Sequence, residues 1–311
     1  MVSDVVVREK EIVVNVRGPT GYLVADRVYE NIITLNLLCM LSRGFGGPER
    51  QITSVDGIVR TLVRIIDLPN MCNIRAGTGT TTPSANDNDV PNFVEIIVPT
   101  ATMVKVDNAY EIRFYGAPTV NINTFGLQQL VHFEYPTTSV DTRTYLYTRV
   151  LAPIPAGTSF MYAMRIPHPL NANFSAFLYG WFTRGTPAMM DMDGVVRSVQ
   201  GRYPHASRAS FILVSNADVD DSVDRATVPS YTLLPASAGF AVGSRQGIVS
   251  VSASFMATTT YTIRLIGLVK DLIDTGGTLR RFLLALRMLP TPVTLAPGER
   301  RGITINLITR M

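Results

Sequence analysis

The side chains that could do metal chemistry are the carboxylates of two short acidic segments. One is Asp191 to Gly194, and loops that carry several carboxylates can bind Ca²⁺. Neither this segment nor the second one, Asp218 to Asp224, has the ligand spacing or the closing glutamate of an EF-hand calcium loop. The competing interpretation of both is therefore an acidic turn exposed to solvent. A bound ion would stiffen a loop or a subunit contact. The second segment supplies the weak calcium candidates Asp218, Asp220, Asp221 and Asp224.

Side chains that could act as nucleophiles, bases or phosphate ligands follow no known catalytic pattern. The stretch Gly77 to Thr82 is rich in glycine and threonine, but no Gly-Lys-Ser/Thr follows it, as a phosphate-binding loop requires. His132, His168 and His205 have no cysteine or carboxylate at a metal-ligand spacing, and neither HExxH nor GxSxG occurs. A triad assembled from distant residues stays open at this point. We expect a protein that is not an enzyme and uses no cofactor or metal.

Cysteine and aromatic side chains have both a functional and a structural interpretation, and the structural one is favoured. Cys39 and Cys72 belong to no CxxC pair, which favours two small buried side chains over a disulfide between them. Trp181, with Tyr179 and Phe182, could form a carbohydrate-binding platform on an exposed strand. Core packing is the commoner role of such residues.

The composition points to contacts with other proteins rather than with nucleic acid or membrane. Charged residues make up 17% of the chain, against about 25% in ordinary soluble domains, so other subunits are expected to cover much of the surface. Arginine accounts for all but three of the 28 basic residues. Arginine is favoured in interfaces, although genomic composition bias would have the same effect. The basic residues form no run, so a sequence-specific nucleic-acid partner is not expected.

Neither a membrane-spanning segment nor a secretory signal is expected from the sequence. No apolar run approaches the roughly 20 residues of a membrane-spanning helix, so no transmembrane segment is expected. Met1 is followed by Val, Ser and Asp, which argues against a secretory signal and predicts synthesis in the cytoplasm.

One helix is predicted, from Leu23 to Arg43. Its apolar residues recur at helical spacing, and Gly44 to Pro48 end it. Apolar residues also lie outside this single face, so we expect a neighbouring subunit to cover part of the helix. The residues that share the main face are Val24, Val28, Ile32, Leu35 and Cys39.

The rest of the chain reads as short strands, so the predicted fold class is mainly β. The N-terminal stretch Val5 to Val16 is one predicted strand, and Ser54 to Ile66 is ambiguous between helix and strand. Glycine, proline, asparagine and aspartate separate the segments. The other predicted strands are Phe93–Val98, Tyr110–Tyr115, Leu130–Tyr135, Thr144–Leu151, Thr158–Ile166, Ala176–Phe182, Ser210–Val214, Ile248–Met256, Thr259–Leu265, Arg281–Leu289 and Ile303–Thr309.

Two segments suggest an internal repeat. RTYLYTRVL (Arg143–Leu151) and RFLLALRML (Arg281–Leu289) share two arginines and a leucine, and a proline-glycine turn and a closing strand follow each. Arg149 and Arg287 would then be equivalent. The sequence predicts two tandem antiparallel β-sandwich, jelly-roll-like domains. These are residues 1–167, with the N-terminal helix, and residues 168–311, as an internal duplicate.

A family resemblance supports this interpretation. The segment IRAGTGTTTPSANDNDV (Ile74–Val90) resembles a GTGTTxPxxxDxxL stretch of phage tail-fibre-like and other virion-associated proteins, in which it follows a single N-terminal helix. VSASFMATTTYTIRLIGL (Val251–Leu268) and LPTPVTLAPGERRGITINLI (Leu289–Ile308) look like the ending of that family. The chain departs from the pattern at Asn86 and Asn88, where acidic residues are usual, and in having a second copy.

The resemblance implies a non-enzymatic structural protein of a virion, as a tail, neck, fibre, turret or capsid component of a bacteriophage or archaeal virus. Its expected partners are copies of itself, other virion proteins and, for host attachment, a surface glycan. A shell-forming jelly-roll capsid protein and a carbohydrate-binding or depolymerising tail-spike-type protein are the alternatives. The residues expected at subunit interfaces are Val28, Ile33, Leu37, Leu41, Thr78, Thr80, Thr81, Met189 and Met190.

Overall fold

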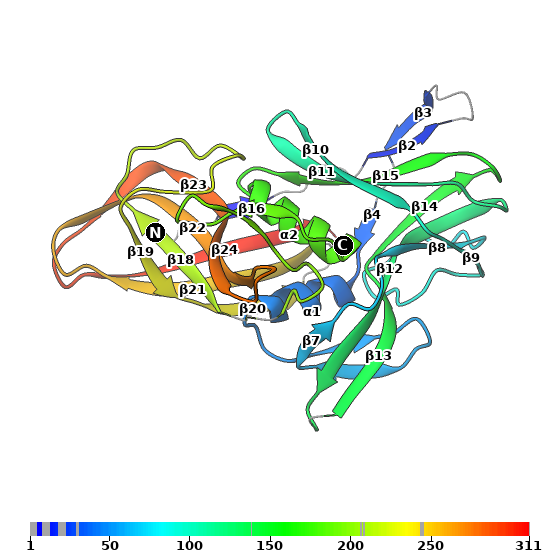
Figure 1. The fold of residues 1–311 in the computed structure, drawn as a ribbon, viewed down its shortest axis with the longest axis horizontal. Coiled ribbons are helices and arrows are strands. Elements are labelled where there is room, and N and C mark those ends of the chain that lie inside the picture. Colours follow the sequence, from blue (N-terminus) through cyan, green and yellow to red (C-terminus); the bar gives the residue numbers. More distant parts are fainter. Residues whose placement is uncertain are drawn as a thin grey trace.

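The computed structural model describes the backbone of residues 5–7, 13–17, 23–28, 31–137, 139–205, 207, 209–242 and 246–310 (Figure 1). Side chains are described within residues 32–307 of these ranges, residue 246 excepted. Strands dominate this part of the chain, which contains two helices and several antiparallel sheets. The prediction of a mainly β protein is therefore confirmed.

The N-terminal half forms two sheets whose side chains meet. Across the first, the β12 sheet, lie β4 (Asn31–Ile33), β14 (Thr148–Ile154), β12 (Ile122–Tyr135), β8 (Asn73–Gly77) and β9 (Phe93–Ile97), with β7 (Arg64–Asp67) and β13 (Ser139–Leu146) also paired to β12. Across the second, the β11 sheet, lie β10 (Thr100–Val106), β11 (Ala109–Gly116), β15 (Phe160–Pro167), β2 (Val13–Arg17) and β3 (Leu23–Val28). The ring centroids of Phe125 and Phe160, one from each sheet, are 5.0 Å apart. The two sheets thus share a core.

The C-terminal half also forms two sheets. Across the β22 sheet lie β19 (Tyr231–Pro235), β18 (Ser210–Ser215), β22 (Tyr261–Ile273) and β23 (Leu279–Leu295). Across the β21 sheet lie β1 (Val5–Val7), β24 (Arg300–Arg310), β21 (Gln246–Met256) and β20 (Ser237–Val242). Because β1 runs parallel to Ile305–Leu307 of β24, the first described strand of the chain lies in a sheet of the C-terminal half.

The strands follow the same order in both halves. The order β9-β8-β12-β14 in one sheet matches β19-β18-β22-β23 in another, and β10-β11-β15 matches β20-β21-β24. Gly126 and Gly267 occupy matching places in the central strands, since the residue after each pairs with an isoleucine, Ile74 or Ile212. The halves differ at one end, because β2 is antiparallel to β15 whereas β1 is parallel to β24.

The predicted equivalence of Arg149 and Arg287 is wrong by one residue. Counted from the matching glycines, Arg287 corresponds to Val150. A shift of one residue along a strand turns a side chain to the other face of the sheet. Accordingly, Arg149 is buried and Arg287 is exposed.

The predicted N-terminal helix is correct only in its second half. Helix α1 spans Leu35–Gly44, after Thr34 in an extended conformation at the N-cap. Residues Leu23–Val28 and Asn31–Ile33 are instead β3 and β4, paired with β2 and β14. The valines and isoleucines that gave the helical spacing are β-branched and fit a strand equally well. Pairing with distant strands decided between the two.

Helix α1 is covered by its own chain. Every residue from Asn36 to Gly44 is buried, and the helix contacts β20, β21, β7 and the short strand β5 (Arg50–Thr53). A helix that is apolar on most sides must be covered on most sides, but the two halves of this chain do so without a neighbouring subunit.

The predicted strand Ala176–Phe182 is part of a helix. Helix α2 spans Ala172–Thr183, and the side chain of Asn171 accepts a hydrogen bond from the Phe174 N–H at its start. Trp181 is fully buried, so it forms no exposed platform. A short apolar run without alternation does not distinguish a buried helix from a buried strand. The sequence feature that favours the helix over the strand is Asn171, a residue type that commonly caps helix N-termini.

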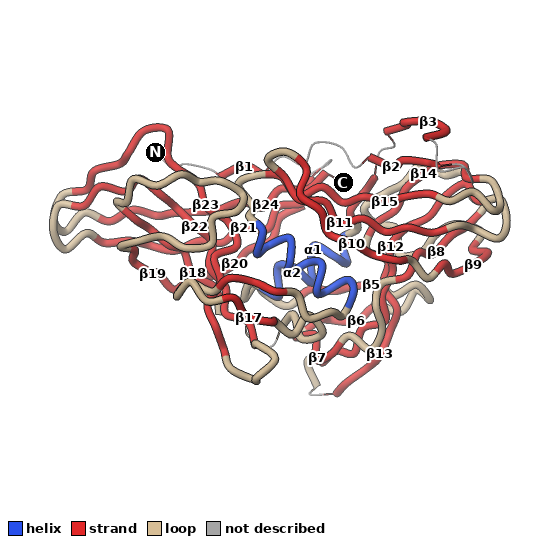
Figure 2. Tube along the Cα trace, turned by 45° about the horizontal axis from the view of Figure 1, so that its top comes forward, coloured by secondary structure: helices blue, strands red, loops and turns tan. Residues whose placement is uncertain are grey.

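Both helices lie between the two β-rich halves (Figure 2). Helix α2 contacts β10 and β11 on one side and β23 on the other. Buried apolar residues from all four large sheets and both helices form one contiguous core. Two short hairpins complete the fold, β5 with β6 (Val59–Leu62) and β16 (Ala188–Met190) with β17 (Val196–Ser198).

The remaining differences from the sequence prediction are local. The predicted strand Thr144–Leu151 is divided between β13 and β14 at Tyr147, and the ambiguous segment Ser54–Ile66 contains β6 and most of β7. The predicted strand Val5–Val16 holds β1 and all of β2 except Arg17, and its residues 8–12 lie outside the described ones.

Candidate assembly surface

The four calcium candidates do not come together around one site. Asp218 is exposed, and each of the others has its own partners. Within the described ranges, no group of three or more histidine, cysteine or carboxylate side chains could hold a metal ion. The partners are Arg225 for Asp220, His168 and the Met288 N–H for Asp221, and Lys105 and Tyr110 for Asp224.

The acidic segment at Asp191 is a closed turn. The buried Asp191 carboxylate accepts hydrogen bonds from the Asp193 and Val195 N–H groups, at 3.1 and 2.9 Å, and from the Arg197 Nε at 2.9 Å. Burial by itself would raise the pKa of Asp191, but the bonds from Arg197 and Val195 outweigh it and hold the pKa below its usual range. These bonds fix the turn.

The threonine-rich loop, residues 78–92, is anchored by a buried arginine. The Arg149 guanidinium forms an ion pair with Asp87 and donates to the Thr81 carbonyl and Oγ1 at 2.6 and 2.8 Å. Arg149 is a residue of β14, so these bonds hold the loop against the β12 sheet. The Thr78 N–H also donates to the Asn92 carbonyl at 3.0 Å, which closes the loop. The loop therefore has a fixed shape.

The predicted interface residues Thr78, Thr80 and Thr81 are exposed on this loop. The loop leads directly into β9, the last strand of the β12 sheet (Figure 1). The Thr78 N–H bonds the Asn92 carbonyl just before β9, whereas Thr81 lies at Arg149 of β14.

Strand β9 exposes apolar side chains at most of its positions. The exposed fractions are 43% for Phe93, 42% for Val94, 49% for Ile96 and 70% for Val98, which directly follows the strand. Among the described strands, β8 is its sole partner, so its second backbone edge is open. Such an edge is a template for pairing with another chain, and proteins often limit it with lysines, prolines or bulges. Strand β9 has no lysine, but its pairing with β8 is irregular between Phe93 and Glu95, and Pro91 and Pro99 flank it.

The one charged residue of β9 is used inside the chain. The Glu95 carboxylate accepts hydrogen bonds from the Thr119 N–H and Oγ1, at 3.0 and 2.7 Å, and from the Val120 N–H at 3.4 Å. Val120 is itself exposed. The Arg75 guanidinium lies 3.7 Å from the Phe93 ring centroid. The same guanidinium forms an ion pair with Asp89. We call the threonine-rich loop, β9 with Val98, and Val120 the β9 surface.

The other predicted interface residues divide into three groups. Ile33, Leu37 and Leu41 are buried in the chain's own core, which corrects the expectation that they face a neighbour. The Val28 side chain lies outside the described ones. In the β16 hairpin Met189 is buried and Met190 is exposed, beside exposed Val195 and Val196.

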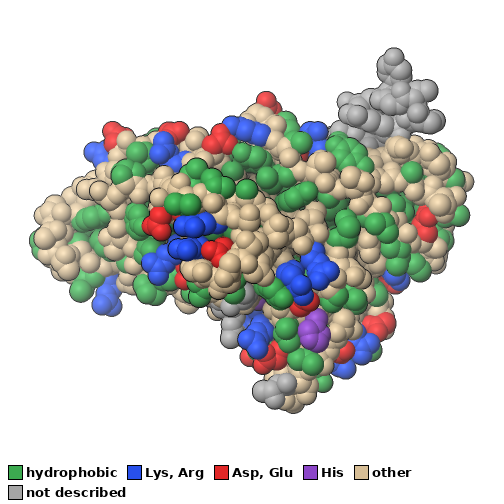
Figure 3. All heavy atoms as spheres, viewed as in Figure 1, with side chains coloured by type: hydrophobic (Ala, Val, Ile, Leu, Met, Phe, Trp, Pro, Cys, Tyr) green, Lys and Arg blue, Asp and Glu red, His purple; other side chains and the backbone are tan. Residues whose placement is uncertain are grey.

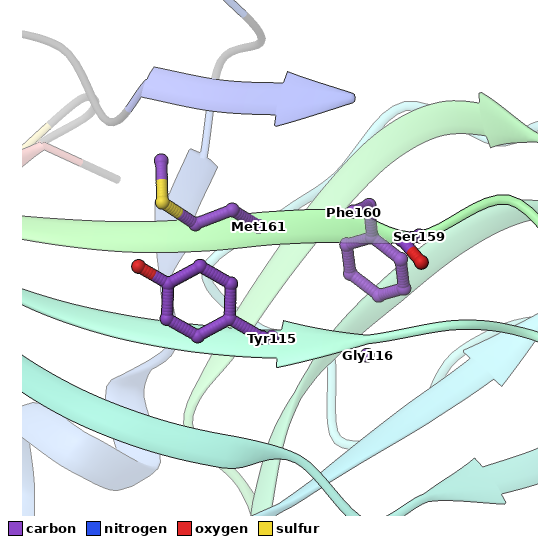
Figure 4. Close-up of a pocket in the computed structure, with 5 residues that line it drawn as sticks. All are labelled: Tyr115, Gly116, Ser159, Phe160 and Met161. Atoms are coloured by element: carbon purple, nitrogen blue, oxygen red, sulfur yellow. The ribbon is translucent and has the colours of Figure 1, made fainter. Parts of the chain in front are cut away.

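Several cavities open on the surface, and one of about 550 Å³ is lined by Thr183, Arg184 and Arg202, among others. Two smaller ones lie elsewhere. One, of about 360 Å³, lies between β11 and β15, where Tyr115 and Met161 are neighbours across the strand pair (Figure 4). Its lining contains no charged side chain. Another, of about 320 Å³, is lined by Asp193, Asp271 and Tyr231, among others. Burial raises the pKa of Asp271, and Arg281, 3.3 Å away, opposes the rise.

Several further sequence expectations can be compared with the structure. Cys39 and Cys72 are free and buried, as the favoured interpretation predicted. On the face that Figure 3 shows, basic and acidic side chains lie next to each other, without a large area of one sign. Among the described residues, no helix is long and apolar enough to cross a membrane.

The sequence predicts β9 as a strand, Phe93–Val98, but does not predict its exposed apolar face. The available signal was FVEIIV, a run of one aromatic and four β-branched residues that a single charge interrupts, between Pro91 and Pro99.

Comparisons with protein-family models, with curated proteins and with solved structures found no match for this chain.

Proposed function

We propose that this chain is a non-enzymatic structural subunit of a virus particle, which acts by assembling with copies of itself and with other virion proteins. The observation that carries the proposal is the β9 surface, a strand at the end of its sheet with exposed apolar side chains, whose one carboxylate is hydrogen-bonded within the chain. An edge of this kind is a liability in a monomer and an asset in an assembly.

The proposal includes a fold of two tandem antiparallel β-sandwiches of the jelly-roll type, divided near Pro167 to Leu170. The first strand of the chain would complete the second sandwich. The matching strand orders of the two halves support a common origin by duplication. The two buried helices would then lock the sandwiches into one rigid building block, a property that suits a lattice or ring.

Assembly can be tested with the purified full-length chain. Electron microscopy and light scattering at rising concentration are expected to show oligomers or regular particles. A mass that stays that of one chain at every concentration would contradict the proposal. A shell-forming capsid protein, the first alternative, would form closed shells, whereas a tail, neck or fibre component would form rings or fibres.

A carbohydrate-binding role remains the second candidate because of the cavity at Asp193 and Asp271. Glycosidases use two carboxyl groups, one of them with a raised pKa, and burial raises that of Asp271. The ion pair with Arg281 argues against a free acid there. This second candidate can be tested by measuring glycan binding on an array and glycan hydrolysis in solution. Both assays should compare the wild type with Asp271→Asn. Our proposal predicts no hydrolysis by either protein.

A further inference from the structure

We propose that two copies of this chain pair through their β9 strands, antiparallel and about a two-fold axis, with Ile96 opposite Ile96. This inference rests on the proposed function and specifies the contact by which copies meet. It starts from the directions of the side chains. Val94, Ile96 and Val98 alternate along the chain and share one exposed face. Ile97 points to the other face and is buried.

The exposed face of β9 is self-complementary. A two-fold contact uses the same patch on both subunits, so residue i meets residue j and j meets i. The exposed side chains along this face are Val94, Ile96 and Val98, so their order is valine, isoleucine, valine in either direction along the strand. With Ile96 opposite Ile96, each Val94 lies opposite a Val98. Three cross-strand pairs of β-branched residues result, which is a favourable combination in sheets.

The same register keeps the two carboxylates apart. Glu95 of one copy lies opposite Ile97 of the other, so no like charges face each other directly, an arrangement that would destabilise the pair. Each Glu95 also keeps its own bonds to Thr119 and Val120. The lysines that usually block edge pairing are missing from the strand.

The length of the pairing is limited at both ends. Pro99 has no N–H for a ladder hydrogen bond, and Asn92 has a positive φ of 53°, which interrupts the extended strand. The pairing with β8 is also irregular at Val94, between Phe93 and Glu95, so Ile96 lies in the regular part of the ladder. A pair of such short strands buries less than the roughly 1,000 Å² of a specific interface. Phe93 of the strand itself, together with Val120 and the end of the threonine-rich loop that precedes β9, must supply the rest.

The counterpart strand in the C-terminal half does not offer the same edge. Strand β19 has an exposed Tyr231 and Thr232, a buried Leu234 and Pro235 at its end. Its exposed face therefore does not read the same in both directions. Of these two corresponding edges, β9 alone fits a second copy of itself.

A cysteine at the two-fold axis tests this register. Directly opposed residues of antiparallel strands have Cα atoms about 4.5–5.5 Å apart, which is within the range of a disulfide. The full-length Ile96→Cys variant is therefore expected to form a covalent dimer under mild oxidation. The native Cys39 and Cys72 are buried and should not react. Val196→Cys is the matched control, since Val196 is a 61% exposed strand valine elsewhere, and it should stay uncrosslinked.

A charge at the same place tests the energetics. Ile96→Lys puts two ammonium groups opposite each other and is expected to weaken self-association at least about tenfold. Val196→Lys should have no such effect. Both positions are exposed, so circular dichroism should show both variants folded; Val94→Lys is a second variant with the same expectation as Ile96→Lys.

The outcomes separate this inference from the proposed function. If Ile96→Cys does not crosslink and Ile96→Lys associates like the wild type, the β9 pairing is wrong while assembly stands. If Val196→Lys disrupts the association instead, the β16 hairpin is the contact. A β9 surface that binds a different protein instead of a second copy would overturn the two-fold pairing. A wild type that stays at the mass of one chain at every concentration would overturn the proposed function as well.

Discussion

At the scale of single residues, the least expected feature is a fully buried lysine. Lys270 of β22 donates hydrogen bonds to the carbonyls of Gly44, at the end of α1, and of Ser207, the latter at 2.8 Å. Its ammonium group lies 5.5 Å from the Phe45 ring centroid. The side chain thus joins the C-terminal half to α1. Burial lowers the pKa of Lys270 to about 7, and the nearby Asp271 opposes the shift.

The lowered pKa predicts a stability that rises with pH. Between about 7 and the ordinary lysine value of 10.5, the unfolded chain binds a proton that the folded chain lacks, so the free energy of unfolding increases with pH. The slope from this group is at most about 1.4 kcal/mol per pH unit. Urea unfolding at pH 7 and pH 9 should show this rise for the wild type and a smaller one for Lys270→Met. An unchanged rise in that variant would contradict the assignment, and Lys105→Met is the exposed control.

The buried ion pair of Arg149 predicts a large loss of stability on substitution. Arg149→Met leaves Asp87 and the Thr81 carbonyl without their donor, which should lower the free energy of unfolding by about 2–4 kcal/mol. The exposed pair of Arg64 and Glu134 is the control, and Arg64→Met should cost less than about 1 kcal/mol. Chemical denaturation measures both. Equal effects would mean that the loop anchor adds nothing beyond a surface ion pair.

At the scale of elements, the strands were more predictable from the sequence than the helices. Alternating segments such as Tyr110–Tyr115 and Ile303–Thr309 are strands, as predicted. Alternation of apolar and polar residues along the sequence directly indicates a half-buried strand. The segments Leu23–Ile33 and Ala176–Phe182 have no such pattern, and their conformation depends on partners far away in the chain. Propensity and spacing are weak evidence there.

The candidate site was predictable only in part, for a related reason. The exposed positions of Thr78, Thr80 and Thr81 follow from a polar loop. The exposed apolar face of β9 depends on the strand order, which places β9 at the end of its sheet. Burial of Ile33, Leu37 and Leu41 likewise depends on the C-terminal half packing over α1. Neither fact can be read from local sequence.

The cap of α2 gives a prediction at this scale. Asn171 is buried, caps the helix and donates from its amide to the Arg225 and Leu283 carbonyls at 2.9 and 2.8 Å. Asn171→Ala removes the cap and leaves both carbonyls without this donor, which should cost about 2–4 kcal/mol. Thermal unfolding compares it with Asn86→Ala, an exposed loop position. A cost no larger than that of Asn86→Ala would show that the amide contributes little.

At the scale of the whole molecule, the two halves are joined more closely than a chain of two separate domains would be. The first described strand, β1, pairs with the last described strand, β24, and α1 and α2 each contact sheets of both halves. We propose that a duplicated sandwich was fused through these elements into one unit. The matching places of Gly126 and Gly267 support a common origin.

A shared core predicts one cooperative unfolding transition. Denaturation followed by tyrosine fluorescence and by far-ultraviolet circular dichroism should give coincident curves, as two-state unfolding requires. Residues 168–311 expressed alone should not fold, because they lack β1 and the cover that α1 gives to β20 and β21. Two separate transitions, or a stable isolated C-terminal half, would contradict the shared core.

The central claim is that this protein works by assembling with copies of itself. The most direct measurement is the mass of the full-length chain in solution as a function of concentration, by sedimentation equilibrium, for the wild type and for Ile96→Lys. We predict that the wild-type mass rises from that of one 34.1 kDa chain to dimers and larger species, and that the variant requires a much higher concentration to do so. A wild type that stays at the mass of one chain throughout would contradict the account.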